Sequence, residues 1–410
     1  MPHEARISLV SSSISTSQIV FELEGFYKNE VMTPRGEAWQ ISLDKGGANL
    51  TQGAPDLPVF ASSVIIPDQA RMELKIISAA FVEYDNVLIV PSKGNLTRQV
   101  NPSDIPYSFG KVYEIDADYP GKLGNLADPY IIRDYRGQAL QIHPFQYNPV
   151  TRQLKVYYHI EFGMVENGQS DKNAMDRIQP PDRINSRFSA LYERHFINYA
   201  SAGRYDPVGE EGSMLIISHA DFLEEIEPLA AWKRLSGIPC EVVNVEDIGG
   251  ADDIKQYIQE EYDNGDLTFV LLVGDADKVP VSQSMGNDSD NDYTFVAGDD
   301  HYPDLFIGRF SAETEEHVST MVNRTLTYEM DPVPDTAWYT RAIGIASQEG
   351  PGDDGELDFE HLRNISENKL IPFTYTYAFE FFEGSQGGND GEGYPSDQLG
   401  NFRIQQLGYR

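Results

Sequence analysis

Apolar runs in the second half of the chain alternate with amphipathic stretches at a regular spacing. The run from Thr268 to Val273 is apolar and β-branched without alternation, as expected for a strand buried on both faces of a parallel sheet. Similar runs at 214–217 and 240–245 are separated by helical patterns over 221–236 and 252–262. This order at this spacing predicts right-handed crossovers and a doubly wound parallel sheet.

The same pattern continues toward the C-terminus. A strand, a helix and a further buried strand are predicted at 304–309, 313–328 and 341–347. We therefore expect an α/β domain over residues 213–377. Few apolar residues follow Phe382, so the tail over 378–410 is expected to be poorly ordered.

The first part of the chain has a different pattern. Residues 5–165 contain short β-branched or aromatic runs bounded by Pro and Gly, which is typical of an all-β sandwich or barrel. The clearest runs are 19–26, 59–66, 72–79, 86–90, 131–134 and 154–162. Turn-forming residues at 148–153 predict a hairpin. The polar stretch 166–212 contains Pro180-Pro181 and is interpreted as a linker.

Composition excludes some partners. The chain has 31 basic and 65 acidic residues and a pI near 4.4, which argues against nucleic acid or an anionic membrane as a partner. An acidic surface favours an extracellular, cation-rich setting. No apolar stretch is long enough to predict a transmembrane helix. The apolar segment at the N-terminus is too short for a signal peptide, so either the protein stays inside the cell or its true start lies upstream.

Carboxylates crowd the region after the central buried strand. Asp275 stands where that strand ends, and further acidic residues follow at Asp288, Asp290, Asp292, Asp299, Asp300 and Asp304. They form either a solvated acidic loop or a site for a hard cation such as Ca²⁺, which binds carboxylate and carbonyl oxygens. An EF-hand is excluded, because Tyr293 occupies the place of its required Gly and no Glu stands at its twelfth position.

The single cysteine offers little chemistry by itself. Cys240 lies at the start of a predicted strand, and no internal disulfide or multi-cysteine metal site is possible. No His lies near it in sequence in a way that suggests a catalytic pair. We interpret it as a small buried hydrophobic residue.

Several segments resemble the gingipain family of secreted bacterial cysteine endopeptidases. The stretches VLLVGD and GDDHYPDLFIGRFS, followed by residues 313–328, resemble the catalytic domain. The segments GAPDLPV, IIRDYRG and PFQYNPV resemble the pro-domain that precedes it. The resemblance implies a caspase-like α/β domain and an inhibitory β-rich pro-domain that docks on it until cleaved. It also implies secretion and a protein or peptide substrate cut after basic residues.

The resemblance also implies roles for individual residues. Glu349 matches the acid that orients the catalytic His, and Asp358 matches the specificity-pocket carboxylate, which would prefer a guanidinium group. Arg204 precedes a Tyr-x-Pro-Val segment like the one at which mature gingipains begin, so processing is expected after it. Family pro-domains present a basic side chain to the specificity pocket, for which Arg133 or Arg136 is the candidate.

A calcium site is implied in the acidic run. The family's site maps onto Asp275, Asp300 and Asp304, with the backbone carbonyls of Ala297 and Tyr302. All five would supply oxygen ligands, as calcium requires. The resemblance therefore names Ca²⁺ as the cofactor.

The family's catalytic Cys–His pair is missing. Its Gly-His-Gly and Ala-Cys-Val-Asn segments do not occur in this sequence. The chain is therefore expected to be a truncated precursor that is inactive as given, because thiolate chemistry needs a nucleophile beside a base. One alternative is a non-enzymatic secretion-associated or binding protein on the same scaffold. Another is an unrelated hydrolase that uses carboxylates such as Glu349 and Asp358.

Overall fold

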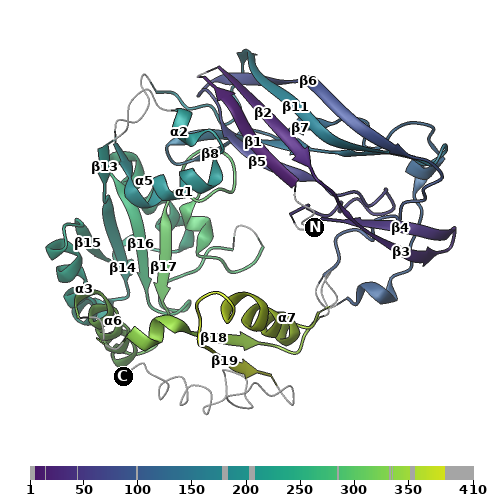
Figure 1. The fold of residues 1–410 in the computed structure, drawn as a ribbon. Coiled ribbons are helices and arrows are strands. Elements are labelled where there is room, and N and C mark those ends of the chain that lie inside the picture. The colour runs from purple at the N-terminus through teal and green to yellow at the C-terminus, as the bar shows by residue number, and fades with distance from the viewer. Residues whose placement is uncertain are drawn as a thin grey trace.

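The protein consists of a β-rich N-terminal region and a C-terminal α/β region, which lie beside each other (Figure 1). A computed structural model shows this arrangement. It describes residues 5–13, 15–43, 45–97, 100–177, 183–202, 208–283, 286–331, 334, 336–350 and 356–383. Within these ranges, no helix combines the length and the apolar character needed to cross a membrane.

Two antiparallel sheets and a hairpin form the N-terminal region. One sheet has the order β1-β2-β11-β10 with β6 also paired to β11, and the other has the order β5-β9-β7 with β8 paired to β9. Strands β3 and β4 form the hairpin. The strands are β1 (Ala5–Ser12), β2 (Thr16–Leu23), β3 (Tyr27–Thr33), β4 (Gly36–Ser42), β5 (Phe60–Ile65), β6 (Ala70–Tyr84), β7 (Gly124–Leu126), β8 (Tyr130–Ile132), β9 (Tyr135–Ile142), β10 (Phe145–Asn148) and β11 (Gln153–Gln169).

The two sheets share one hydrophobic core. Ile19 and Phe21 of β2 pack in the same buried cluster as Leu140 and Ile142 of β9. Their burial follows from the alternation of apolar residues along each strand. The predicted hairpin is confirmed, since β10 pairs with β11 across a turn in which Asn148 Oδ1 accepts backbone N–H groups.

One predicted strand of this region is wrong. The apolar run 86–90 is buried, but its only strand-like pairing in the described chain is a single bridge between Trp39 and Ile89. Neighbouring backbone groups bond in other directions: the Val87 N–H donates to Arg152 O over 2.9 Å. The run is apolar because it is buried, and this made its sequence look like that of a strand. It does not form a continuous series of strand hydrogen bonds.

Short elements connect the two regions. Strand β12 (Arg183–Asn185) pairs in parallel with β13 (Val208–Glu210), and the helices α1 (Ser186–His195) and α2 (Tyr199–Ala202) lie between them in sequence. Asn185 caps α1, because its side-chain oxygen accepts the N–H groups of Arg187 and Phe188. The connection thus starts and ends in one small two-stranded sheet.

The α/β region contains the predicted parallel sheet. Its order is β15-β14-β16-β17, with every pair parallel. Its strands are β14 (Ser213–Ser218), β15 (Cys240–Asn244), β16 (Leu267–Val273) and β17 (Phe306–Phe310). Its helices are α3 (Leu223–Leu235), α4 (Val245–Ile248), α5 (Ala251–Asn264) and α6 (Glu315–Met330).

Helices cover both faces of this sheet. Ile216 of β14 packs in one cluster with buried residues of α3 and α6, whereas Leu215 and Ile217 pack in another cluster with buried residues of α5. Adjacent residues of one strand therefore enter different cores, which explains the unbroken apolar runs. The prediction of a β-rich region followed by a doubly wound α/β region is confirmed.

A second small sheet follows. Strands β18 (Arg341–Ala346) and β19 (Tyr377–Phe382) pair in parallel, and α7 (Asp358–Ile365) lies between them in sequence. We predicted a buried strand here, but Ile343 is 40% and Ile345 is 45% exposed. The reason is that α7 packs against the other face, where Leu362 approaches Gly344.

Candidate functional site

The two regions meet at the loop before β17, residues 297–304, which we name the acidic loop. The Ile131 N–H donates to Asp300 Oδ2 over 2.8 Å, and the Arg133 N–H donates to Asp304 Oδ1 over 2.6 Å. In the other direction, the Asp299 N–H donates to Asn173 Oδ1 over 2.7 Å. Backbone and side chains of the N-terminal region thus hold the acidic loop from several sides.

Asp304 is the most deeply placed of these carboxylates. Its side chain is fully buried, and its two oxygens accept the N–H groups of Arg133, Val296 and Ala297. Burial raises the pKa of Asp304 to about 7, and the three N–H groups oppose that rise. Burial also raises the pKa of Asp300. Desolvation thus outweighs hydrogen bonding at both carboxyls.

The Arg133 side chain ends beside the start of the parallel sheet. Its Nη1 donates to Leu267 O over 2.7 Å and to Asp304 O over 3.1 Å. Its guanidinium lies over the rings of Phe188 and Tyr262, at 5.2 and 5.3 Å from their centroids. The backbone at Arg133 is left-handed, with φ of 42°, a conformation that an arginine rarely adopts.

Neither candidate arginine lies against Asp358. Arg133 is bound at the amino-terminal end of β16, as described above. Arg136 is fully buried in the N-terminal region and donates to the carbonyls of Pro67, Ala70 and Lys172. Both guanidinium groups donate hydrogen bonds to backbone carbonyls away from Asp358. The structure therefore corrects the prediction that either arginine enters the specificity pocket.

Aromatic contacts extend the junction. The rings of Tyr130 and Tyr302 stack with centroids 4.0 Å apart, and the Tyr130 hydroxyl lies 2.7 Å from His195 Nε2. Phe188 of α1 packs against Phe306 of β17 at 4.7 Å. Apart from Tyr302, whose carbonyl was a predicted calcium ligand, sequence analysis did not select these residues. The contacts join positions 65 or more residues apart, and no local pattern signals them.

The predicted calcium ligands are not gathered at one place. Asp300 and Asp304 belong to the acidic loop, which leads into the amino-terminal end of β17. Asp275 follows the carboxyl-terminal end of β16, and these strands are parallel, so Asp275 lies at the opposite edge of the sheet. There Asp275 Oδ1 accepts a hydrogen bond from the Ser311 hydroxyl over 2.8 Å, which lowers the pKa of Asp275.

The fit to a calcium ion is correspondingly poor. In the part of the chain that the structure describes, no group of three or more acidic, His or Cys side chains is arranged to hold a metal. Ala297 donates its N–H to Asp304, and Tyr302 donates its N–H to Asp300 Oδ1. The carboxylate oxygens of Asp300 and Asp304 therefore bind N–H groups.

Glu349 and Asp358 lie together beyond the end of β18. The Asp358 N–H donates to Glu349 O over 3.0 Å. The Ser347 hydroxyl donates to Asp358 Oδ2 over 2.6 Å and accepts the Glu349 N–H over 3.1 Å. Ser347 therefore links the two predicted residues. Its place directly after the largely apolar run 341–346 was the sequence signal that could have identified it.

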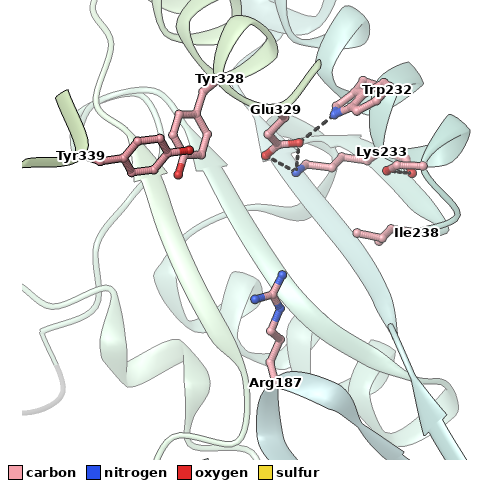
Figure 2. Close-up of a pocket in the computed structure, with 8 residues that line it drawn as sticks. Arg187, Trp232, Lys233, Ile238, Tyr328, Glu329 and Tyr339 are labelled. Carbon is pink, nitrogen blue, oxygen red and sulfur yellow. Dashed lines mark hydrogen bonds and ion pairs between the residues drawn. The ribbon is translucent and has the colours of Figure 1, made fainter. Parts of the chain in front are cut away.

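A hollow of about 480 Å³ opens elsewhere on the α/β region (Figure 2). Lys233 of α3 pairs with Glu329 of α6 at 2.7 Å, and Trp232 Nε1 donates to the same carboxylate. Tyr328, Tyr339 and Arg187 also line the hollow. It contains none of the predicted site residues, and the ion pair on its wall joins α3 to α6.

Known proteins resemble both regions of the chain. Residues 3–196 match the C25 propeptide and residues 208–397 match peptidase family C25. The chain belongs to peptidase family C25. It is 37% identical over 385 residues to gingipain R1 of Porphyromonas gingivalis, covering 92% of this chain and 38% of that protein. Identity to gingipain R2 of the same species is 36% over 388 residues, covering 92% of this chain and 52% of that protein.

Solved structures include a complex of the pro- and mature domains of RgpB from Porphyromonas gingivalis. That match has 32% identity and a TM-score of 0.45, and it covers 48% of this chain and 97% of the matched chain. The chain thus spans between about two fifths and about half of the length of the two gingipain R relatives. We refer below to its N-terminal region as the propeptide region and to its α/β region as the peptidase region.

Two further residues complete the account of the predicted site. Arg204, the expected processing point, lies outside the described residues. Cys240 lies at the first position of β15, where burial raises the pKa of its thiol. This is the opposite of the lowered pKa that a catalytic thiol needs, so the structure supports a structural role for Cys240.

Proposed function

We propose that the chain contributes its propeptide and peptidase regions to the precursor of a secreted cysteine endopeptidase that cuts after basic residues. The observation that carries this proposal is the docking of Ile131 and Arg133 on Asp300 and Asp304. Because the propeptide region binds a specific loop of the peptidase region, the two regions form one folded unit, as expected for a zymogen. Membership of family C25 supplies the reaction class.

Processing after Arg204 suits the surroundings of that residue. Strands β12 and β13 pair on either side of the connection that contains it. Cleavage of that connection would therefore leave paired strands and the acidic-loop contact in place. We propose that the two regions stay associated after the chain is cut.

The preference for basic residues rests on Asp358. Its carboxylate is held by the Ser347 hydroxyl beside Glu349, and a partly buried carboxylate favours the forked hydrogen bonds of a guanidinium group. The environment of Cys240 does not suit a nucleophile. We therefore propose peptidase chemistry for the precursor that contains this chain, rather than for the chain by itself.

An activity-based probe tests this function. A biotinylated peptidyl-arginine chloromethyl ketone alkylates an activated thiol, so it is applied to cells and medium of the source organism and captured proteins are identified by mass spectrometry. We expect peptides from 213–383 in the captured fraction of the medium, and their loss after iodoacetamide treatment. If these peptides occur in the untreated medium but are never captured, the proposed activity is wrong.

A further inference from the structure

We propose that two copies of the chain associate through strand β6 of the propeptide region, paired edge to edge and antiparallel. Three features of β6 support this association: an unpaired edge, an uncharged apolar run that is exposed to solvent, and opposite charges at the two ends of that run. The association is independent of the proposed function, because β6 takes no part in the contact with the acidic loop.

Strand β6 lies at an edge of its sheet, on the far side of the propeptide region from the α/β region (Figure 1). Its 15 residues pair in antiparallel with β11 on one side. Within the described residues, no other strand pairs with β6. The N–H and C=O groups on the free side of such a strand are able to hydrogen bond with a further strand. The free edge of β6 is therefore a ready site for strand addition.

The middle of β6 is apolar and exposed. Residues 76–82 have the sequence IISAAFV, which contains no charged residue and no Pro. The large side chains Ile76, Ile77, Phe81 and Val82 are 46%, 54%, 45% and 47% exposed. Edge strands are commonly protected by charges, by Pro or by a bulge. In β6 one irregularity occurs, at Ile77, and the run has neither of the other two protections. This run therefore indicates a surface that a partner strand covers.

Charge complementarity points to a second copy of the chain as this partner. Lys75 and Glu83 flank the run at equal distances from Ala79, and both are exposed. In an antiparallel pair with Ala79 of both copies at the two-fold axis, Lys75 of each copy faces Glu83 of the other. The same arrangement places Ile77 opposite Phe81, and both kinds of cross-strand pair stabilise a sheet. A parallel arrangement would instead place like charges together.

Sedimentation equilibrium of the full chain measures this association without an activity assay. A junction of two strands buries less area than a stable protein interface, so we expect a dissociation constant of roughly 10–100 μM. The mass should rise from 46.0 kDa toward twice that value as the protein concentration is raised through this range, and it should rise no further, because a two-fold contact closes on itself. A mass of 46.0 kDa at every concentration, or growth beyond the dimer, would overturn the proposal.

Charge reversal tests the antiparallel pairing. Lys75→Glu and Glu83→Lys each place like charges opposite one another at both ends of the pair, so each should weaken the dimer about tenfold. The double variant restores opposite charges and should dimerise as the unmodified chain does. An equimolar mixture of the two single variants should form a mixed dimer, because there every contact between positions 75 and 83 joins opposite charges. Single variants that dimerise normally, or a double variant that does not recover, would contradict this pairing.

A second pair of variants locates the contact on β6. Ile77→Lys places a charge within the exposed run and should prevent dimerisation. Val10→Lys is the matched control, because Val10 is 57% exposed on β1, the opposite edge strand of the same sheet, and this variant should dimerise as the unmodified chain does. Thermal unfolding shows that each variant is folded, and the charge reversals test the contact independently of Ile77. A dimer that Val10→Lys dissociates and Ile77→Lys does not would overturn the assignment to β6.

Discussion

Arg133 and Asp304 are joined by two hydrogen bonds, one from the Arg133 backbone N–H to Oδ1 and one from the guanidinium to the carbonyl oxygen. Asp304 lies two residues before β17, so this contact fixes the propeptide region at the amino-terminal end of the parallel sheet. Asp275 lies at the other end. The anchor of the propeptide region is thus separate from the carboxyl-terminal edge, where α/β folds usually place their ligand sites.

Removal of the Arg133 side chain should loosen the junction. Arg133→Ala loses hydrogen bonds to Leu267 O and Asp304 O and the contacts with two aromatic rings, which we expect to lower the free energy of unfolding by roughly 1.5–3 kcal/mol. Urea denaturation measures this. Arg152→Ala is the matched control, because Arg152 also has a positive φ but lies in the turn between β10 and β11. Equal losses in both variants would contradict the anchor.

Gly298 tests how closely the regions approach. A Cβ there would lie 2.9 Å from Asp300 Oδ2 and 3.2 Å from Ile131 Cδ1, and φ is +81°. Gly286 has φ of +82° with nothing within 4 Å, so its substitution carries the same backbone strain without the contact. We expect Gly298→Ala to be about 1–3 kcal/mol less stable than Gly286→Ala in thermal or urea unfolding. No difference between them would mean that the contact is absent.

Asp56 makes stability depend on pH. Burial raises the pKa of Asp56 to about 6, and the folded chain therefore holds this proton more tightly than the unfolded chain. Its contribution is present below pH 4 and is lost as the pH rises through about 6. We expect Asp56→Asn to match the unmodified chain near pH 3 and to exceed its stability by about 3 kcal/mol at pH 8. Unfolding curves at several pH values check this, and a constant difference would refute it.

Processing depends on one arginine. Brief trypsin treatment should release a fragment that begins at Tyr205, because Arg204 lies in a connection rich in Gly, Pro and charged residues. Arg204→Gln should abolish this N-terminus in Edman sequencing. Arg194→Gln, an exposed position within α1, should leave it unchanged. Cleavage mainly at other sites of the unmodified chain would count against processing after Arg204.

The sequence predicted the helices and strands better than the tertiary contacts between them. The run from Thr268 to Val273 is apolar or β-branched at every position because it has a helical layer on each face, so its pattern identified β16 directly. The run from Arg341 to Ala346 looks similar but is half exposed, because in the part of the chain that the structure describes a helix, α7, covers one face of it. Whether a second layer covers a strand depends on tertiary structure, which periodicity does not contain.

The candidate site was predicted less well for a topological reason. Asp275 and Asp304 lie close in sequence, yet one follows β16 and the other precedes a parallel strand, so the chain crosses the sheet between them. The predicted parallel order of these strands already implied that Asp275 and Asp304 lie at opposite edges of the sheet. The two residues should therefore not have been assigned to one calcium site. The contacts of Tyr130 and Arg133 with the acidic loop gave no such signal, because they depend on how the two regions pack.

A double-mutant cycle between Tyr130 and Tyr302 tests the docking of the two regions most directly. The free energy of unfolding is measured for the unmodified chain, Tyr130→Ala, Tyr302→Ala and the double variant. The stacked pair, 4.0 Å apart, predicts a coupling of about 0.5–1.5 kcal/mol. Phe81 and Tyr157, which pack 5.0 Å apart within the propeptide region, form the control pair. Coupling in both cycles supports docking on the acidic loop; coupling in the control and none between Tyr130 and Tyr302 would contradict it.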